Sequence, residues 1–202
     1  MKKIIVLFVA ILISANVEAR RNQPQDIPVT IYFHDGTQRE GFLRPLAVDA
    51  TRVEFRSERG GRVERFESSS IERIRRYDED DESFGEAVWL PRILVSISGN
   101  VRERGPRWLT VLVVGPVTLY RVFEGGMSHY FAKRENESTP RRIASGTDMT
   151  NIGGTVLRNN GWKFFEDTYP ELAERIRNGE FENTSADVRA IVHEYNFRAG
   201  QR

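Results

Sequence analysis

The side chains that most often carry catalysis or bind metals are scarce in this chain. It has three histidines, His34, His129 and His193, and no cysteine. No two histidines stand at the spacing of a metal-binding motif, and a zinc site would need all three to converge with a carboxylate. Serine and acidic residues occur, but the G-x-S-x-G elbow of a hydrolase and its alternation of strands and helices are missing. The sequence therefore indicates no metal site, no cofactor and no catalytic residue.

The acidic and glycine-rich segments are equally unspecific. Residues 78–82 form an uninterrupted acidic run, which could bind a hard cation through its carboxylate oxygens. The run lacks the alternating ligands and the central glycine of an EF-hand loop, so a solvated linker between two units is the preferred interpretation. Residues 153–154 are a glycine pair without the lysine of a phosphate-binding loop, and we interpret them as a turn.

Aromatic side chains are the one group whose pattern could indicate binding. Tyr120, Phe123, Tyr130 and Phe131 fall on one expected hairpin. Aromatic groups exposed on a sheet can recognise a protein or a sugar, so these four are the candidate binding residues. The alternative is that they form a core between the strands and the helices that follow. We favour the core, because a chain without disulfides must be stabilised by what it buries.

The first residues have the pattern of a secretory signal peptide. Lys2 and Lys3 precede the ten apolar residues 4–13, whereas a membrane-spanning helix needs about twenty. Val17 and Ala19 are small residues at the positions that signal peptidase reads, so cleavage is expected after Ala19. A lipid anchor would need a cysteine at the cleavage point. The mature chain is therefore expected in the periplasm or outside the cell, with no membrane span.

The balance of charge gives no indication of a nucleic-acid partner. The chain has 30 basic and 29 acidic side chains, and removal of residues 1–19 leaves 28 of each. A surface with this balance has no net attraction for a phosphate backbone. Nearly all basic residues are arginines, since Lys133 and Lys163 are the lysines that follow residue 19. Arginine pairs with carboxylates through two hydrogen bonds, but codon preference is the preferred explanation.

Residues 27–77 are expected to form a small β barrel or curled sheet. Apolar and polar residues alternate from residue 27 to residue 34, which is typical of a half-buried strand, and Asp35-Gly36 predicts a turn. Further strands are expected at residues 41–43, 52–56 and 63–66. The apolar positions in residues 71–77 recur at a spacing of three, which favours a helical turn.

Residues 87–200 are expected to form an antiparallel meander followed by two helices, so that the fold class is α+β. Glycine turns at 105–106, 115–116 and 125–126 separate strands at intervals of about ten residues. Residues 133–151 are polar and are expected to be a loop.

Two amphipathic helices are predicted at residues 165–177 and 188–195, with capping boxes at Thr168 and Thr184. Each is too short to be stable alone in water. Both are therefore expected to pack on the sheet, and the apolar strand at residues 108–114 is the expected surface.

Two resemblances accompany these predictions. The run VTIYFHDGTQREGFL resembles the first motif of Sm-like and other SH3-like barrels, but the second Sm motif with its RNA-contacting asparagine is not visible, so RNA binding is not implied. The chain as a whole resembles a group of uncharacterised exported proteins of Bacteroidetes bacteria. The shared segments are the DGT turn, VTLYRVF, HYFAKRE, GWKFFEDTYPELAERIRNGEF and the helix that ends in HEYN. This resemblance implies export and the same organisation, and it implies no activity.

The leading hypothesis is a non-catalytic cell-envelope protein that binds a protein or glycan partner. A hydrolase that acts on an envelope polymer and a structural or assembly factor are the alternatives. A deep pocket with convergent polar groups would favour the enzyme, and an exposed apolar patch would favour the binding protein.

Overall fold

The computed structural model describes residues 26–77, 85–146, 155–182 and 184–201. Within these ranges ten strands pair in one sheet, in the order β10-β9-β8-β7-β6-β5-β1-β2-β3-β4, and helices follow at the C-terminal end. The prediction of a mostly β protein with C-terminal helices is confirmed. No helix in the described ranges is both long enough and apolar enough to cross a membrane. The predicted signal peptide, the acidic run and the glycine pair lie outside the described residues.

The N-terminal half of the sheet consists of five short strands. They are β1 (Ile27–Phe33), β2 (Gln38–Leu43), β3 (Arg52–Arg56), β4 (Glu64–Glu67) and β5 (Ile71–Arg76). The short 3-10 helix η1 (Ser68–Ser70) leads into β5, which returns to pair with β1. Val29 and Ile31 of β1 are buried together with Phe55. At Gly41 a Cβ would lie 2.2 Å from the carbonyl oxygen of Arg56, so a side chain there would force β2 and β3 apart.

Strand β5 corrects the prediction of a helical turn at residues 71–77. The pairing register between β5 and β1 skips Glu72, which is therefore an extra residue in the strand. This β-bulge puts Ile71 and Ile74 on the same buried side, although they are three positions apart. A bulge thus produces the spacing that, in the sequence, suggests a helix.

The C-terminal half of the sheet is the predicted antiparallel meander with one additional pairing. Its strands are β6 (Gly85–Val95), β7 (Val101–Val113), β8 (Val117–Glu124), β9 (Met127–Arg134) and β10 (Arg141–Gly146). Strand β10 also pairs with β6 in parallel, through Arg141 and Ile93. The N–H of Ile93 donates to the carbonyl oxygen of Pro140 at 2.9 Å, and the guanidinium of Arg142 donates to that of Val95. Strands β6 to β10 therefore form a closed cycle of pairings, the β6–β10 cycle.

The turn predicted at Gly105 and Pro106 is wrong. Both residues lie inside the long strand β7, at the level of Pro91 of β6, where the pairing register shifts. In this part of its length β7 is not paired with β8, whose pairing begins at Thr110. A proline is tolerated at such an edge position, because no hydrogen bond of the sheet needs its missing N–H.

The loop predicted at residues 133–151 is also wrong in part, because it contains β10. Ile143 and Ala144 of this strand are buried, although the surrounding residues are polar. A register shift against β9 between Arg142 and Ala144 breaks the regular alternation there. The segment therefore shows no period of two in the sequence.

Both predicted helices are present, and a third precedes them. The helical elements are α2 (Thr155–Asn160), the 3-10 helix η2 (Gly161–Phe164), α3 (Pro170–Arg177) and α4 (Ser185–Ala199). The capping box at Thr184 is confirmed, since its side chain accepts from the N–H of Asp187 and the Asp187 carboxylate accepts in return. The capping box at Thr168 is wrong, because the N-cap of α3 is Tyr169, which makes no side-chain cap.

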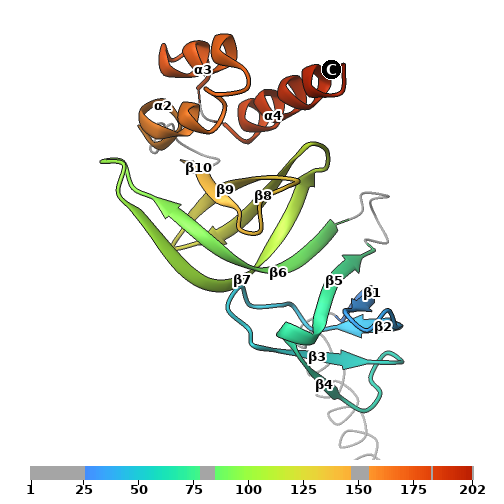
Figure 1. The fold of residues 1–202 in the computed structure, drawn as a ribbon. Helices are drawn as coiled ribbons and strands as arrows, with labels where there is room; N and C mark the ends of the chain where they lie inside the picture. Colours follow the sequence, from blue (N-terminus) through green and yellow to red (C-terminus); the bar gives the residue numbers. More distant parts are fainter. Residues whose placement is uncertain (1–25, 78–84, 147–154, 183, 202) are drawn as a thin grey trace, which may run out of the picture.

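The helices cover one side of the β6–β10 cycle, and β1 to β5 lie on the other side (Figure 1). The strand residues buried beneath the helices are Val113, Val117, Leu119, Tyr130, Ala132, Ile143 and Ala144. They come mainly from β8, β9 and β10. Residues 108–114, the expected surface, contribute Val113 and the partly buried Leu112, so that expectation holds only in part. The side chain of Asn196 on α4 fixes the contact, because it accepts from the N–H of Val117 and donates to its carbonyl oxygen, both at 2.8 Å.

Candidate functional site

A pocket of about 160 Å³ lies where β1, β2 and β5 meet β7 and β8. Its apolar lining includes Ile27, Leu43, Leu46, Val48, Ile74 and Trp108. Most of these residues belong to the buried core of the N-terminal strands or pack against it, so the pocket is an opening into a packed apolar interior. Its walls come from both halves of the sheet.

Three arginines line this apolar pocket. Arg44 follows β2, Arg76 ends β5 and Arg121 lies in β8. None of the described residues that line the pocket is acidic, and Thr110 is the only uncharged polar residue among them. The pocket therefore combines an apolar interior with a net positive charge. This combination suits a ligand that carries an apolar group and an anion.

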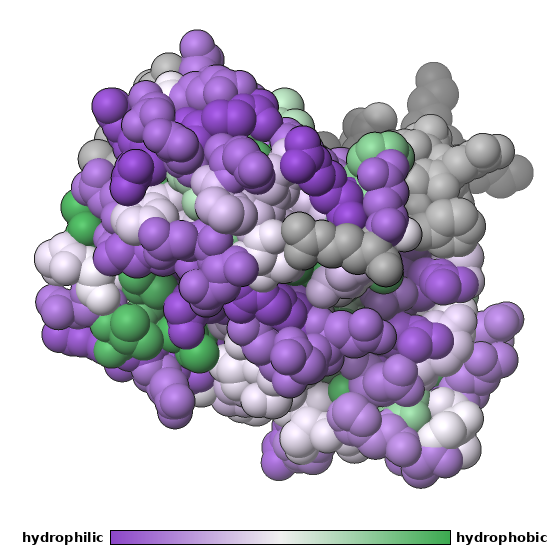
Figure 2. All heavy atoms as spheres, turned by 45° about the horizontal axis from the view of Figure 1, so that its top comes forward, coloured by the Kyte–Doolittle hydropathy of each residue, from purple (hydrophilic) through white to green (hydrophobic). Residues whose placement is uncertain are grey.

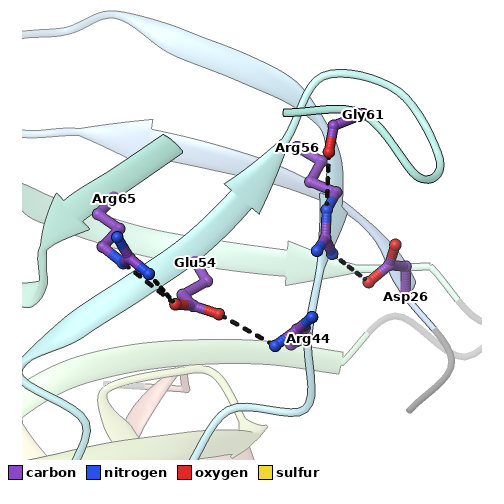
Figure 3. Close-up of polar contacts among 6 residues, drawn as sticks. All are labelled: Asp26, Arg44, Glu54, Arg56, Gly61 and Arg65. Carbon is purple, nitrogen blue, oxygen red and sulfur yellow. Dashed lines mark hydrogen bonds and ion pairs between the residues drawn. The ribbon is translucent and has the colours of Figure 1, made fainter. Parts of the chain in front are cut away.

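The three arginines differ in what they already contact. Arg44 Nη1 lies 3.5 Å from the carboxylate of Glu54, whose other oxygen accepts from Arg65 (Figure 3). In the described part of the chain, neither Arg76 nor Arg121 has a carboxylate within ion-pair distance. The charge of Arg44 is thus partly balanced by Glu54, whereas no carboxylate of the described residues balances the charge of Arg76 or Arg121.

A nearly buried ion pair holds the start of β1 next to the pocket. Arg56 Nη1 lies 2.8 Å from Asp26 Oδ1, and Arg56 also donates to the carbonyl oxygen of Gly61 at 3.0 Å (Figure 3). Asp26 directly precedes Ile27, which lines the pocket. The pair therefore fixes one wall of the pocket to β3.

Trp108 forms a rigid wall of the same pocket. Its indole N–H donates to the carbonyl oxygen of Ala50 at 3.2 Å and lies 3.3 Å from Ser68 Oγ. Its backbone N–H donates to the carbonyl oxygen of Val48 at 2.9 Å. These bonds tie the segment between β2 and β3 to β7. They also hold the Trp108 ring in one position, with its centroid 5.6 Å from that of the Trp89 ring.

The four aromatic candidates from the sequence do not form one surface. Tyr120 and Phe131 are buried in one cluster, and Tyr130 is buried in the core beneath the helices. Burial raises the pKa of the Tyr120 hydroxyl. Phe123 is different, because it is 62% exposed and lines the pocket. Of the four candidates, Phe123 alone is placed to contact a ligand there.

The histidines do not form a site with one another. His34 is exposed in the turn after β1, and His193 is exposed on α4. His129 Nδ1 lies 2.9 Å from Ser145 Oγ, a contact of the type found in serine hydrolases. Ser145 is buried and does not line the pocket. Burial lowers the pKa of His129, and the positive charge of Arg142 lowers it further. Within the described ranges, no group of three or more histidine or acidic side chains could hold a metal ion.

A second hollow and the exposed apolar residues are weaker candidates for a binding site than this pocket. A shallower hollow is lined by Pro116, Arg134, Glu135, Asn136 and Tyr195, but Arg134 already pairs with Glu137 there. Figure 2 shows one face of the molecule, which is mostly hydrophilic with only small apolar places. The exposed large apolar residues are Tyr77, Ile97, Val101, Val114, Phe123 and Phe197, which come from different parts of the chain. Single exposed apolar residues are normal on a protein surface, so the pocket is the stronger candidate.

Sequence reasoning missed the pocket because its charged residues are far apart along the chain. Arg44, Arg76 and Arg121 come from three separate segments, and no local spacing relates them. The excess of arginine over lysine was the available signal, but it does not show which arginines lack a partner.

No protein-family model matches the chain, and comparisons with curated proteins and with solved structures find no significant similarity.

Proposed function

We propose that this chain is a non-catalytic protein of the cell envelope that binds a protein or glycan partner through the arginine-lined pocket. The observation that carries the proposal is the chemistry of the pocket lining, whose described residues join an apolar interior to three arginines and include no acidic residue. The signal-peptide pattern of residues 1–19 supports export to the periplasm or beyond.

The same lining argues against a hydrolase. General acid–base catalysis needs a group such as histidine or a carboxyl, and covalent catalysis needs an activated nucleophile. Among the described residues that line the pocket there is no histidine, no carboxyl group, no serine and no lysine. The contact between His129 and Ser145 lies elsewhere, and the serine is buried.

We also propose that each half of the sheet is a small barrel. The order β5-β1-β2-β3-β4, with a 3-10 helix before the strand that returns to β1, supports an SH3-like connectivity for residues 27–77. The pairing of β10 with β6 supports closure of the second unit. Barrels of this size are filled by side chains, so a ligand would bind between them or at their ends.

Site-specific photocross-linking in cells tests the proposed contact surface. A benzophenone amino acid is placed at Phe123, which lines the pocket, or at Phe197 on α4, which is exposed to a similar degree, 69% against 62%. The proposal expects a discrete cross-linked product at position 123 that is absent at position 197. Equal products at both positions, or none at position 123, would contradict it.

Fractionation and N-terminal sequencing test the location. The proposal expects a mature chain in the envelope or medium that begins at Arg20. An intact Met1 on a cytosolic protein would contradict export.

A further inference from the structure

We infer that the group that enters this pocket is the C-terminal residue of a polypeptide, with its apolar side chain in the pocket and its carboxylate against Arg76 and Arg121. The inference rests on the proposed function and chooses a protein partner over a glycan.

The size of the pocket limits the apolar group. Its volume of about 160 Å³ is close to that of an engineered protein cavity, about 150 Å³, which binds benzene. Sites for drug-sized ligands are larger, about 300–1,000 Å³. The pocket therefore accepts one side chain of the size of leucine or phenylalanine, and it is too small for a long acyl chain.

The charge around the pocket determines the other group of the ligand. Glu54 partly balances Arg44, whereas the described residues place no carboxylate at Arg76 or Arg121. Arg76 and Arg121 line the same pocket. A guanidinium group has several N–H donors, and a carboxylate accepts such donors in a bidentate way. The required ligand thus carries a carboxylate close to a compact apolar group.

A polypeptide C-terminus meets both requirements in a single residue. Its carboxylate and its side chain are attached to the same Cα, and capture of terminal carboxylates is a recurring mode of peptide recognition. A sugar needs many hydrogen-bonding partners for its hydroxyl groups, but Thr110 is the only uncharged polar residue among the described residues of the lining. The lining therefore favours the peptide over the glycan.

The experiment uses the full mature chain and short N-acetylated peptides. Binding is measured by calorimetry and by tryptophan fluorescence. Fluorescence is suitable because Trp108 lines the pocket. The probes are one peptide that ends in phenylalanine with a free carboxylate, the same peptide as its C-terminal amide, and the same peptide ending in alanine. We expect the free acid to bind and each of the other two to bind at least tenfold more weakly. Arg76→Gln and Arg121→Gln should each weaken binding of the free acid at least tenfold.

Arg52→Gln is the matched control, because Arg52 is exposed on β3, pairs with Glu67 and does not line the pocket. It should leave binding unchanged. Arg76→Lys and Arg121→Lys keep the charge and should retain part of the affinity. Thermal unfolding of every variant separates a loss of binding from a loss of fold.

The inference is overturned if the amide binds as tightly as the free acid, or if 3-phenylpropionate alone binds as tightly as the peptide, since the ligand would then be a small acid. Binding of a uronic-acid oligosaccharide in place of the peptide would also overturn it. If no peptide binds while cross-linking at position 123 persists, the ligand class is wrong and the proposed function stands. If the peptide binds but no cross-link forms in cells, the proposed partner contact fails and the pocket chemistry stands.

Discussion

Replacement of Asp26 by asparagine should lower the free energy of unfolding by about 2 kcal/mol, because it removes the charge that compensates a nearly buried guanidinium. The side chains of Arg56 and Asp26 are 12% and 13% exposed, and their atoms approach to 2.8 Å. Loss of one partner of a buried ion pair costs about 3–5 kcal/mol. The asparagine keeps an acceptor for Arg56, which also retains its bond to Gly61, so the lower value of about 2 kcal/mol is expected.

Urea unfolding followed by tryptophan fluorescence measures this loss, and thermal unfolding should show a decrease in Tm of about 4–8 °C for a chain of this size. The control is Glu67→Gln, which makes the same change from acid to amide in the pair of Arg52 and Glu67. That pair is equally short, 2.7 Å, but its side chains are 66% and 57% exposed. Exposed pairs contribute about 0–1 kcal/mol. If both variants lost the same stability, burial would not determine the contribution, and the reasoning would be refuted.

Ile191→Asp should lower the free energy of unfolding by more than about 3 kcal/mol, because it places an unpaired carboxylate in the core beneath the helices. The control is His193→Asp on the exposed face of the same helix, which should change the free energy of unfolding by less than about 0.5 kcal/mol. Asn196→Ala should cost about 2 kcal/mol, because it leaves the N–H and the carbonyl of Val117 unpaired, and an unchanged Tm would contradict this. Burial lowers the pKa of His129 from its ordinary 6.5, so the unfolded chain binds this proton more readily than the folded chain. Stability should therefore fall as the pH drops below about 6.5, and urea midpoints at about pH 7.5 and about pH 5.5 should differ less in His129→Gln.

The parts of the fold that the sequence predicts are those where periodicity is local and undisturbed. Strand β1 alternates regularly, and α4 has both its apolar stripe and its capping box at Thr184. The failures within the strands share one physical cause, an irregularity in strand pairing. A bulge at Glu72 places the buried residues of β5 at a spacing of three, as in a helix. Gly105 and Pro106 lie opposite Pro91 at a register shift between two paired strands, so they form no turn. Such irregularities depend on the neighbouring strand, which a single segment of sequence does not reveal.

The candidate site is less predictable than the fold for a related reason. Its aromatic component, Phe123, is among the residues that the sequence suggests, but three of its companions are buried. The value of an arginine for binding depends on whether a carboxylate already contacts it. Arg44 and Arg121 look alike in the sequence, and only the pairing of Glu54 with Arg44 distinguishes them. This information is tertiary, so sequence patterns could not supply it.

The β6–β10 cycle has one weak junction. Between β10 and β6 the strands share a single pair of residues and rely on the Ile93 N–H and the Arg142 guanidinium, whereas β8 and β9 are paired along their whole length. Separation of β10 from β6 is therefore the least costly local opening of the cycle, because it breaks fewer pairings than separation of any other two neighbouring strands in it. The amide of Ile93 should consequently exchange its hydrogen with solvent faster than the paired amides of β8 and β9. Because Leu94 of β6 packs against the buried cluster that contains Phe131, this opening would expose that cluster while the other pairings stay formed.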